Sequence, residues 1–593
     1  MSRILSLLTL FLFITSSATL RAQKGDWYTD DSSLGFAGHG TKASPYLIAS
    51  VSDLVALADQ ANAYKSKGFP GVYFRLTADL DLGAHYWIPI GTEAEYPFRG
   101  IFDGNGKCIR NLYLGVHGSD NLFPASGLFG CLGNGARVEN LSIEGGRIWG
   151  GNREQTARSG ALAGYAYCTE DSIIIRNCHN DRVAVYANGT ETTQTGGLIG
   201  ECCAASSDGG EAVIRLEDCS NSGTVHADTA FTAHTGGLVG KAGCRSYADT
   251  GGKSAGRLLL LHCKNSGTVR GGSVTGGEAL SATGGLVGYV YANGNTYGKE
   301  ESRSEAGIAY CLNTGDIRGG TAFCPQSLTY TGGLVGYVDG SSYAEGQTRS
   351  PFHGLGRLNL STSANRGAVQ GGRVRLRSGS ASTGGLIGYA SAIGTTGEAA
   401  SGAIATGDFL LRNCYNAAAL FSRRGMLGGL IGTLSARVKG KQAFAYARVS
   451  HCYAAGTLNQ GDTIFPVITG GLFGHIQKDP GRQARLQAIG CLAALTYLNG
   501  LLEHTFRLAG QMEGFQNGEN PLAGNYAYAA EGEWVRSETK PENGLNWRLS
   551  LAAPPLASWN LKEKTWLFPS AKNSLPLLLR LEGQEAVPLP AAH

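Results

Sequence analysis

The chain has 593 residues, of which 89 are glycine, with 42% hydrophobic and 16% charged residues. Glycine is about twice as frequent as its average usage of about 7%. The glycines keep no three-residue period and there are only 17 prolines, which excludes collagen. A net charge of +4, from 50 basic and 46 acidic residues, excludes a disordered polyelectrolyte and gives no reason to expect a nucleic-acid partner. The composition favours many repeated tight turns.

Residues 1–22 have the pattern of a secretory signal peptide. A single cation, Arg3, precedes the apolar run Ile4–Ile14, and small residues lead to Ala22. The run is too short to cross a bilayer, and no later stretch reaches the roughly 20 apolar residues that a membrane-spanning helix needs. No cysteine follows the run, which disfavours a lipid anchor. We therefore expect an exported protein at the cell surface, associated with the outer membrane, or extracellular.

Residues 23–107 form the next predicted unit, an N-terminal cap with a short helix. Ser52 and Asp53 resemble a helix start. The apolar residues that follow at helical spacing are Leu54, Leu57, Ala58 and Ala61. Four short extended stretches then occupy residues 73–76, 79–82, 87–90 and 98–102. Such a segment would cover the open end of a repeat array, which otherwise exposes a sheet edge.

Residues 108–500 are predicted to be a repeat region, because a Gly-Gly-Leu-x-Gly phrase recurs there. It reads SGLFG at 126–130, TGGLVG at 283–288 and TGGLFG at 469–474. Nine copies, one of them degenerate, are spaced 34 to 52 residues apart. Their closing glycines are Gly130, Gly164, Gly200, Gly240, Gly288, Gly336, Gly388, Gly432 and Gly474. The uneven spacing indicates one fixed structural unit with variable connections.

A second phrase, apolar-x-x-Cys-x-Asn-x-Gly-x-Val, lies about midway between these copies. Apolar and polar residues alternate through it, as in Leu358-Asn359-Leu360, which is the period of a strand. A unit of this size cannot bury its apolar face alone, so the repeats must stack. We predict an all-β, right-handed parallel β-helix of about nine coils with a cap at each end. A β-propeller is the rival fold, although nine blades exceed the usual four to eight.

Seven cysteines occupy one position of the repeat: Cys178, Cys219, Cys263, Cys311, Cys414, Cys452 and Cys491. The total of 14 in an exported protein would ordinarily suggest disulfides. Ser363 replaces cysteine in one copy, however, as expected of a small buried side chain in a structural ladder. We predict a stack of unpaired thiols here. Cys202, Cys203 and Cys244 follow the Gly-Gly phrase and could pair, and this alternative stays open.

Residues 501–593 are predicted to be a C-terminal cap region. Trp547, Trp559 and Trp566 gather there with the segment 575–578. Aromatic residues and prolines suit a cover better than another repeating coil.

The chain resembles the GLUG-motif repeat proteins, which are exported bacterial surface proteins. The resemblance rests on the Gly-Gly-Leu-x-Gly phrase and on segments 40–48, 76–82, 87–91 and 98–106, and it covers roughly residues 36–580. It implies a β-helix that serves in adhesion or surface display. Similar repeats accompany zinc metallopeptidases that cleave immunoglobulin A. No histidine of this chain is followed by glutamate, so the His-Glu-x-x-His motif of such a domain is missing.

The sequence offers little catalytic chemistry. Gly252–Gly256 matches Gly-x-Ser-x-Gly, but lies in a polar connection of a glycine-rich protein, where chance matches are common. Asp79 and Asp81 could hold calcium or act in acid–base catalysis, although satisfying turn amides is the better interpretation. We predict no catalytic residue, metal or cofactor. The alternative is a carbohydrate-active β-helix enzyme, a polysaccharide lyase or glycoside hydrolase, which would need converging carboxylates.

Four segments that follow the Gly-Gly phrase are predicted to be loops on one side of the solenoid: 241–256, 289–308, 337–356 and 389–408. They are rich in Gly, Ser, Thr and Tyr, the composition of adaptable binding surfaces. We predict that Tyr247, Tyr297 and Tyr343 bind a ligand, either a host or bacterial surface glycan or a protein. The alternative is that these rings only shield the sheet. The protein is expected to be a monomeric adhesin or display module, without a nucleic-acid partner or a transmembrane segment.

Overall fold

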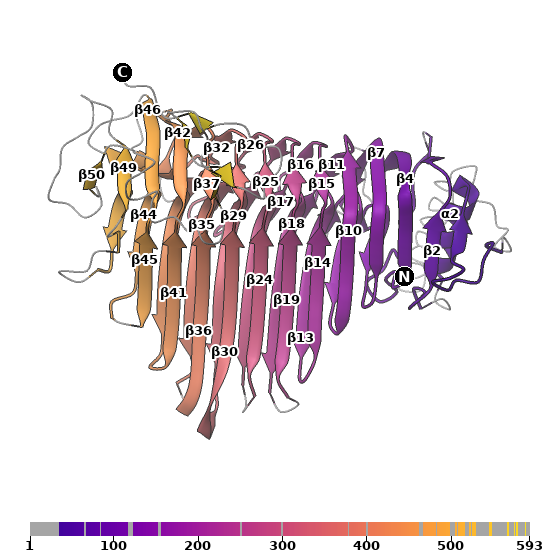
Figure 1. The fold of residues 1–593 in the computed structure, drawn as a ribbon, viewed down its shortest axis with the longest axis horizontal. Helices are drawn as coiled ribbons and strands as arrows, with labels where there is room; N and C mark the ends of the chain where they lie inside the picture. The colour runs from indigo at the N-terminus through magenta and orange to yellow at the C-terminus, as the bar shows by residue number, and fades with distance from the viewer. Residues whose placement is uncertain are drawn as a thin grey trace, which may run out of the picture.

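The computed structural model is nearly all β and forms a parallel β-helix solenoid, which confirms the predicted fold class (Figure 1). It describes residues 35–63, 67–83, 85–116, 123–151, 156–249, 252–297, 300–376, 379–398, 401–461, 467–481, 483–498, 505–506, 508–515, 521–522, 525–528, 545–547, 566–567, 574–575, 577–578 and 587–588. The handedness, the number of coils and the domain boundaries remain predictions. Trp559 lies outside the described residues, as does most of the predicted C-terminal cap.

Three parallel sheets run along the solenoid axis, called here the A-, B- and C-sheets. The long strands of the A-sheet are β4 (Ile101–Leu114), β7 (Arg137–Gly150), β10 (Asp171–Asp181), β14 (Glu211–Glu217), β19 (Ser254–Leu261), β24 (Ser302–Ala309), β30 (Gln347–Ser361), β36 (Ser401–Arg412), β41 (Ala443–Ser450) and β45 (Ala484–Ile489). Its other strands are β1 (Tyr46–Ile48), β2 (Tyr73–Leu76), β3 (Leu80–Asp81), β11 (Ala184–Ala187), β15 (Ser220–Asn221), β16 (Val225–Ala227), β20 (Lys264–Asn265), β21 (Val269–Arg270), β25 (Leu312–Asn313), β26 (Ile317–Arg318), β31 (Ala364–Asn365), β32 (Val369–Gln370), β37 (Tyr415–Asn416), β38 (Leu420–Ser422), β42 (Tyr453–Gln460), β46 (Leu492–Leu498), β49 (Tyr526–Tyr528) and β50 (Leu545–Trp547).

The B- and C-sheets lie on either side of the Gly-Gly phrase. The C-sheet ends at the phrase and contains β5 (Ala125–Ser126), β8 (Ala157–Ser159), β12 (Thr192–Gly196), β17 (Thr232–Gly236), β22 (Leu280–Gly284), β28 (Leu328–Gly332), β34 (Ser380–Gly384), β39 (Gly425–Gly428), β43 (Val467–Gly470) and β47 (Thr505–Phe506). The B-sheet begins after it with β6 (Phe129–Leu132), β9 (Ala163–Cys168), β13 (Ile199–Ser207), β18 (Val239–Ala248), β23 (Val287–Thr296), β29 (Val335–Ala344), β35 (Ile387–Thr396), β40 (Ile431–Lys439), β44 (Phe473–Lys478) and β48 (Ala509–Glu513). Three small pairs complete the described strands: β27 (Thr321–Ala322) with β33 (Arg373–Val374), β51 (Trp566–Leu567) with β53 (Leu577–Leu578), and β52 (Ser574–Leu575) with β54 (Val587–Pro588).

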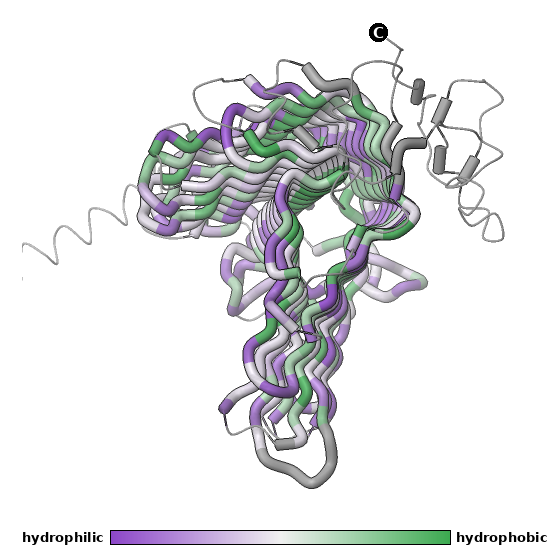
Figure 2. Tube along the Cα trace, turned by 90° about the vertical axis from the view of Figure 1, so that its left-hand side faces the viewer, coloured by the Kyte–Doolittle hydropathy of each residue, from purple (hydrophilic) through white to green (hydrophobic). Residues whose placement is uncertain are grey.

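In cross-section the solenoid has a broad arm and a narrow fin (Figure 2). The fin consists of the B-sheet packed on the long strands of the A-sheet, and the arm contains the C-sheet and the short A-sheet strands. The prediction that segments 241–256, 289–308, 337–356 and 389–408 are loops is wrong, because most of their described residues are fin strands. Small side chains let the two sheets approach closely; Ser246 Oγ, for example, lies 2.7 Å from Ser302 Oγ inside the fin. Gly, Ala and Ser therefore mark close sheet packing here, not flexible connections.

An asparagine ladder lies inside the bend between the A- and C-sheets. Asn265 Nδ2 donates to Asn313 Oδ1 at 2.8 Å, and Asn313 Nδ2 donates to Asn365 Oδ1 at 2.7 Å. The four middle side chains also donate to the carbonyl two residues later in their own coil, as Asn313 does to Gly315 at 2.9 Å. The complete ladder is Asn180, Asn221, Asn265, Asn313, Asn365 and Asn416. These bonds satisfy buried amides and fix the register between coils.

In five successive copies of the phrase the second glycine packs against this ladder. A Cβ on Gly285 would lie 2.0 Å from the Gly333 carbonyl oxygen and 2.5 Å from the Asn313 side-chain carbon. A Cβ on Gly333 would clash in the same way with the Gly385 carbonyl oxygen and the Asn365 side chain. The phrase thus needs glycine for close approach. We predicted either close approach or positive φ at these corners, and only the first applies, because neither glycine of the phrase has φ > 0.

The left-handed residue of each coil lies elsewhere, immediately before the cysteine position. It is His262 before Cys263 and Tyr310 before Cys311, with φ of 55° and 57°. The same conformation occurs at Asn177, Asp218, Thr362, Asn413 and His451. Glycine adopts this region most readily, as at Gly490 before Cys491, and among other residues Asn, Asp and His are enriched there. The His262 and Tyr310 rings stack at 4.8 Å, so neighbouring coils support one another at this bend.

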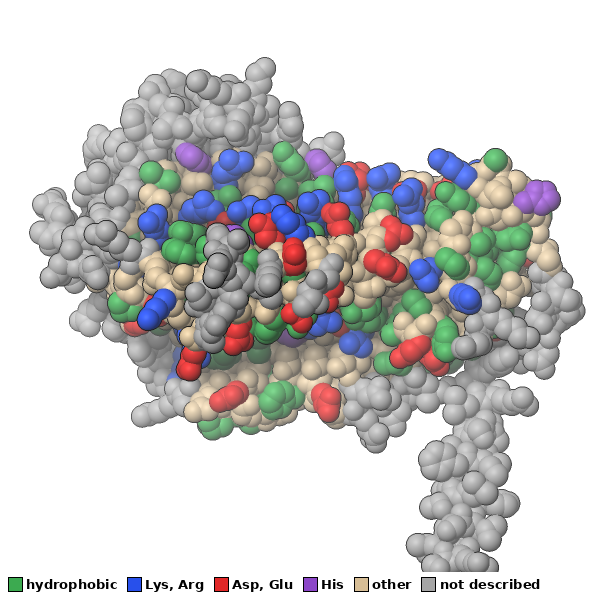
Figure 3. Space-filling view, turned by 90° about the horizontal axis from the view of Figure 1, so that it is seen from below, with side chains coloured by type: hydrophobic (Ala, Val, Ile, Leu, Met, Phe, Trp, Pro, Cys, Tyr) green, Lys and Arg blue, Asp and Glu red, His purple; other side chains and the backbone are tan. Residues whose placement is uncertain are grey.

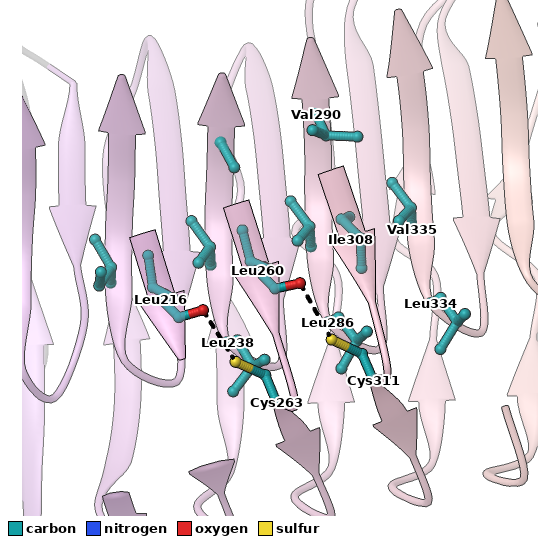
Figure 4. Close-up of a cluster of buried hydrophobic side chains, with 14 of the residues drawn as sticks. Leu216, Leu238, Leu260, Cys263, Leu286, Val290, Ile308, Cys311, Leu334 and Val335 are labelled. Carbon is teal, nitrogen blue, oxygen red and sulfur yellow. Dashed lines mark hydrogen bonds between the residues drawn. The ribbon is translucent and has the colours of Figure 1, made fainter. Parts of the chain in front are cut away.

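The cysteine position faces the core and stacks from coil to coil. Figure 4 shows Cys263 and Cys311 beside the leucines of the Gly-Gly phrase. Each thiol donates to the carbonyl two residues earlier, as Cys263 does to Leu261 at 3.2 Å, and also faces a carbonyl of the preceding coil. Ser363 takes the same place, and its hydroxyl donates to Ser361 O at 2.8 Å. All fourteen cysteines, including Cys202, Cys203 and Cys244, are free thiols.

Helix α2 (Val51–Ala61) lies at the N-terminal end of the stack (Figure 1). It starts slightly earlier than the expected Ser52–Asp53. Ser50 is the N-cap and forms a capping box with Asp53. Leu54, Leu57 and Ala58 are buried in the same core as the first coils. Strand β4 runs through the expected boundary at residues 107 and 108 and pairs with β7, so stacking already begins within the predicted cap.

We predict that Asn313→Ala lowers the free energy of unfolding by about 2–4 kcal/mol, because it removes the ladder bonds to the Asn265 amide and the Asn365 side-chain oxygen and the bond to Gly315 O. The matched control is Asn416→Ala. Asn416 ends the ladder, and its Nδ2 has no hydrogen-bond partner among the described residues. Its replacement should cost about 1 kcal/mol. Equilibrium denaturation of the two variants tests this, and equal losses would show that the ladder does not act as a chain of bonds.

Candidate ligand-binding site

The outward faces of the C- and B-sheets meet at an inside corner, called here the corner groove. The sheets turn at the Gly-Gly phrase, so a C-sheet residue lies opposite a B-sheet residue of the same coil. Tyr330 and Tyr337 face each other in this way, with ring centroids 5.4 Å apart. The corner is the concave side of the cross-section in Figure 2. Because the register is constant, each position forms a column along the groove.

Three successive coils place tyrosine in the first B-sheet column, at Tyr289, Tyr337 and Tyr389. Tyr289 and Tyr337 stack with centroids 4.7 Å apart and planes 9° apart. Tyr389 meets Tyr337 edge to face at 5.6 Å and stacks on Tyr330 at 4.7 Å. The tyrosine cluster, meaning these three residues and Tyr330, therefore fills the middle of the corner groove; Tyr330 is buried and the other three are half-buried.

A cavity of about 500 Å³ opens where the tyrosine cluster ends. It is lined by Leu328, Tyr330, Tyr337, Ser380, Ser382, Tyr389, Ser391, Ile393, Met426, Thr433, Arg437, His475 and Gln477. The space exists because the tyrosine columns continue as small residues. Tyr330 is followed in register by Ser382, and Tyr389 is followed by Thr433.

The polar side chains around the cavity are held in position by hydrogen bonds. Ser382 Oγ and Thr433 Oγ1 are 2.8 Å apart, and Ser382 also donates to Gly388 O at 2.8 Å. Gln477 Nε2 donates to the Tyr389 hydroxyl at 3.2 Å, which links two side chains two coils apart across the cavity wall. Hydroxyl and amide groups beside aromatic rings allow both stacking and hydrogen bonding to a ligand.

Asp339 lies beside the tyrosine cluster in the second B-sheet column. Burial near Tyr289 and Tyr337 raises the pKa of its carboxyl to about 6, although hydrogen bonds from Ser391 and Tyr289 act in the opposite direction. Ser391 Oγ lies 3.4 Å from Asp339 Oδ1. The next carboxylate in this column is Glu513, four coils away and therefore at about 19 Å.

The N-terminal part of the corner groove is filled by an ionic cluster. Glu201, 7% exposed, binds Arg158 at 2.6 Å and Lys241 at 3.1 Å. The Arg158 guanidinium also lies 4.4 Å from the centroid of the Tyr165 ring. Beyond Tyr165 a second cavity, of about 450 Å³, lies against Tyr96. The groove thus has an open space at each end.

Tyr247, Tyr297 and Tyr343, the predicted ligand-binding residues, come together on the outer face of the fin. Tyr247 and Tyr297 are 42% and 40% exposed and stack at 4.9 Å. Tyr297 and Tyr343 follow at 5.2 Å. The neighbouring rings cover one another's faces, so mainly their edges reach solvent. This geometry also suits the alternative of a protective stack, and ligand binding by these residues stays a prediction.

The sequence analysis did not identify the tyrosine cluster, although a signal was present. In three consecutive copies a tyrosine directly follows the closing glycine of the phrase, as Gly288-Tyr289, Gly336-Tyr337 and Gly388-Tyr389. Identical positions in stacked coils lie about 4.8 Å apart, so this recurrence predicts a tyrosine stack.

The remaining sequence candidates have structural partners. Asp79 accepts a hydrogen bond from the Cys108 amide at 3.0 Å, and Asp81 accepts one from the Gly83 amide at 2.8 Å. Both side chains therefore satisfy backbone amides, as expected. Ser254 begins strand β19 and donates to Tyr247 O at 2.7 Å, so Gly252–Gly256 does not lead into the helix that a nucleophile elbow requires. No cluster of three His, Cys, Asp or Glu side chains suited to a metal occurs within the described residues.

The outer face of the A-sheet carries ion pairs. Asp408, 4% exposed, binds Arg357 at 3.0 Å and Arg448 at 2.7 Å. Arg176 and Glu217 pair at 3.2 Å. Basic and acidic side chains are also intermixed on the underside of the solenoid (Figure 3). Because most of these charges are paired, this face offers no strong field for a charged partner.

Comparison with known proteins gives two partial matches. The chain is 31% identical over 203 residues to halomucin of Haloquadratum walsbyi, a match that covers 31% of this chain and 2% of halomucin. It is 33% identical over 151 residues to a protein of Evansella cellulosilytica provisionally named a Gly-rich membrane protein, covering 24% of this chain and 16% of that protein. The chain thus spans a small part of these relatives. No family model matches it.

Among solved structures, the chain is similar to a protein from Bacteroides ovatus provisionally named an immunoglobulin A1 protease. The two share 17% sequence identity with a TM-score of 0.34, over 67% of this chain and 79% of the other. At this distance the similarity supports no argument about function. Within the described part of the chain, no helix combines the length and hydropathy needed to cross a membrane.

We predict that Asp339→Asn stabilises the protein at neutral and higher pH. Because the folded-state pKa of Asp339 is raised to about 6, the folded protein binds this proton more tightly than the unfolded chain does. Stability should therefore fall as the pH rises from about 4 to above 6. The variant should gain about 3 kcal/mol at pH 8 and nothing near pH 4. Urea unfolding across this pH range measures the difference, with Asp218→Asn on an exposed turn as the matched control. A gain that is equal at both pH values would contradict the buried-carboxyl account.

Proposed function

We propose that this chain is an exported, non-catalytic surface protein that binds a carbohydrate chain in the corner groove, and that it is related to the GLUG-motif repeat proteins. One observation carries the proposal: the tyrosine cluster ends directly at a cavity with a floor of Ser382 and Thr433 hydroxyls. Aromatic rings pack on the apolar faces of sugars, and hydroxyl and amide groups match their hydroxyls.

The shape of the corner groove favours a polymer over a small isolated ligand. Cavities lie at both ends of one straight corner, near Tyr165 and near Tyr389. These two positions are five coils apart in the same column, which corresponds to about 24 Å. An extended chain could contact both, and several weak sites would then combine into useful avidity.

The arrangement of carboxylates supports binding over catalysis. Glycoside hydrolysis requires two carboxyl groups about 5 to 9.5 Å apart. Asp339 is the groove carboxyl with a raised pKa, and its nearest partner along its own column, Glu513, is about 19 Å away. The carbohydrate-active enzyme therefore remains the second candidate, favoured only by the raised pKa of Asp339.

The surface location rests on the predicted signal peptide at residues 1–22 and on one relative whose name describes a membrane protein. An adhesin or display module would use the long, rigid solenoid to hold the corner groove away from the cell. A protein ligand in place of a glycan would be recognised by the same tyrosines, since aromatic residues dominate protein interfaces.

The test compares two tyrosine surfaces on an array of glycans and proteins. The groove variant is Tyr337→Ala with Tyr389→Ala, and the matched control is the fin variant Tyr247→Ala, Tyr297→Ala and Tyr343→Ala. We expect the groove variant to lose at least tenfold in affinity for the glycans that the unaltered protein binds, while the fin variant binds normally. Tyr337→Phe with Tyr389→Phe, which keeps the rings, should fold and retain most binding.

Three results would contradict the proposal. Loss of binding in the fin variant alone would show that the ligand binds at the fin tyrosines, as the sequence predicted, and not in the corner groove. Binding to proteins but to no glycan would identify the chain as a protein-binding adhesin. Release of reducing or unsaturated sugar products from a bound glycan, abolished by Asp339→Asn, would establish the enzymatic alternative.

A further inference from the structure

We propose that the cavity beside Tyr389 is a subsite for a carboxylate-bearing sugar, such as a uronic or ulosonic acid, held by Arg437. This inference rests on the proposed glycan-binding function and names the class of sugar. It depends on one basic side chain that lines a cavity otherwise built of rings, hydroxyls and an amide.

Arg437 is the cation of this cavity. It lies in the third B-sheet column, in register with Ile393 of the preceding coil. Its side chain is exposed, lines the cavity, and makes no ion pair with any described residue. The positive charge of Arg437 lowers the pKa of His475. It also lowers the pKa values of Tyr330 and Tyr337, against the larger effect of burial. The guanidinium therefore lies near all three side chains.

Several other arginines of the solenoid are held in ion pairs. Arg357 and Arg448 share Asp408, and Arg158 is neutralised by Glu201. An unpaired guanidinium over a concave, partly dry site retains its capacity for a bidentate contact. Its planar fork matches a carboxylate, and such paired hydrogen bonds are about twice as strong as neutral ones.

The neighbouring charges leave room for an anion at this position. Glu513 lies 3.5 Å from His475 Nε2, so its charge faces the imidazole at the far end of the cavity. Burial lowers the pKa of His475, and Glu513 opposes this effect. Asp339 is two coils from Arg437 and one column away, a separation of roughly 12 Å that exceeds the screening length of about 8 Å.

The remaining lining determines that the anion is part of a sugar. Tyr389 presents a half-buried ring, tied to Gln477 at 3.2 Å, on the wall of the cavity. Ser382 and Thr433 provide hydroxyls on the floor. A volume of about 500 Å³ lies within the usual range for ligand sites, roughly 300–1,000 Å³. A simple inorganic anion would use the arginine but not the ring or the hydroxyl floor.

The experiment measures binding of the full mature chain to acidic glycans by calorimetry. The probes are oligogalacturonate, alginate and hyaluronan oligosaccharides and sialyllactose, each compared with its carboxyl methyl ester. We expect at least one acidic probe to bind at least tenfold more tightly than its ester. Arg437→Gln should abolish this preference, so that each acid and its ester bind the variant equally. The matched control is Arg245→Gln, an exposed arginine of the same column four coils away, which should keep the preference.

The outcomes separate this inference from the proposed function. Equal binding of acids and esters, weakened by Tyr389→Ala, would overturn the acidic subsite and leave the glycan-binding groove intact. An acid preference that survives in Arg437→Gln would also overturn it. If no probe binds while the array detects neutral glycans, the subsite is again wrong. If neither the panel nor the array shows any glycan bound, the proposed function itself fails.

Discussion

In five successive coils the second glycine of the Gly-Gly phrase rests against an asparagine amide, and the rest of the solenoid depends on this contact. Gly285 allows no Cβ beside Asn313, and Gly333 allows none beside Asn365. The asparagines in turn bond to one another through the corner of six successive coils. A side chain on the glycine would push the sheets apart, and a missing amide would leave buried polar groups unpaired. The two sequence phrases are therefore the two sides of a single contact.

A fixed register converts a repeated residue into a column. The leucines and cysteines become a continuous core, and the tyrosines after the closing glycines become a cluster on the outside of the same corner. The corner groove is a direct consequence, since the bend that the glycines allow also brings the C- and B-sheets face to face. A change of residue type along a column changes the shape of the groove. Where Tyr330 and Tyr389 give way to Ser382 and Thr433, a cavity opens.

The sequence was most informative where a residue type recurs in phase. Alternating strands, the cysteine stack and the parallel β-helix follow from that recurrence. It was misleading for the fin, because Gly, Ala and Ser are common both in loops and between closely packed sheets, as at Ser246 and Ser302. It also could not locate the left-handed residue, which is His262, Tyr310 or Thr362 in different coils and has no common chemistry. The cavity depends on the bend between sheets, a three-dimensional property that a one-dimensional pattern does not contain.

Native-state hydrogen exchange tests the central claim most directly. If the glycine–asparagine corner holds the coils in register, peptides spanning the Asn-x-Gly and Gly-Gly-Leu-x-Gly phrases should exchange last, at a rate set by global unfolding. Peptides from the outer ends of the fin strands should exchange earlier through local opening. Exchange at the corner that is as fast as at the fin ends, with the slowest exchange elsewhere, would contradict the account.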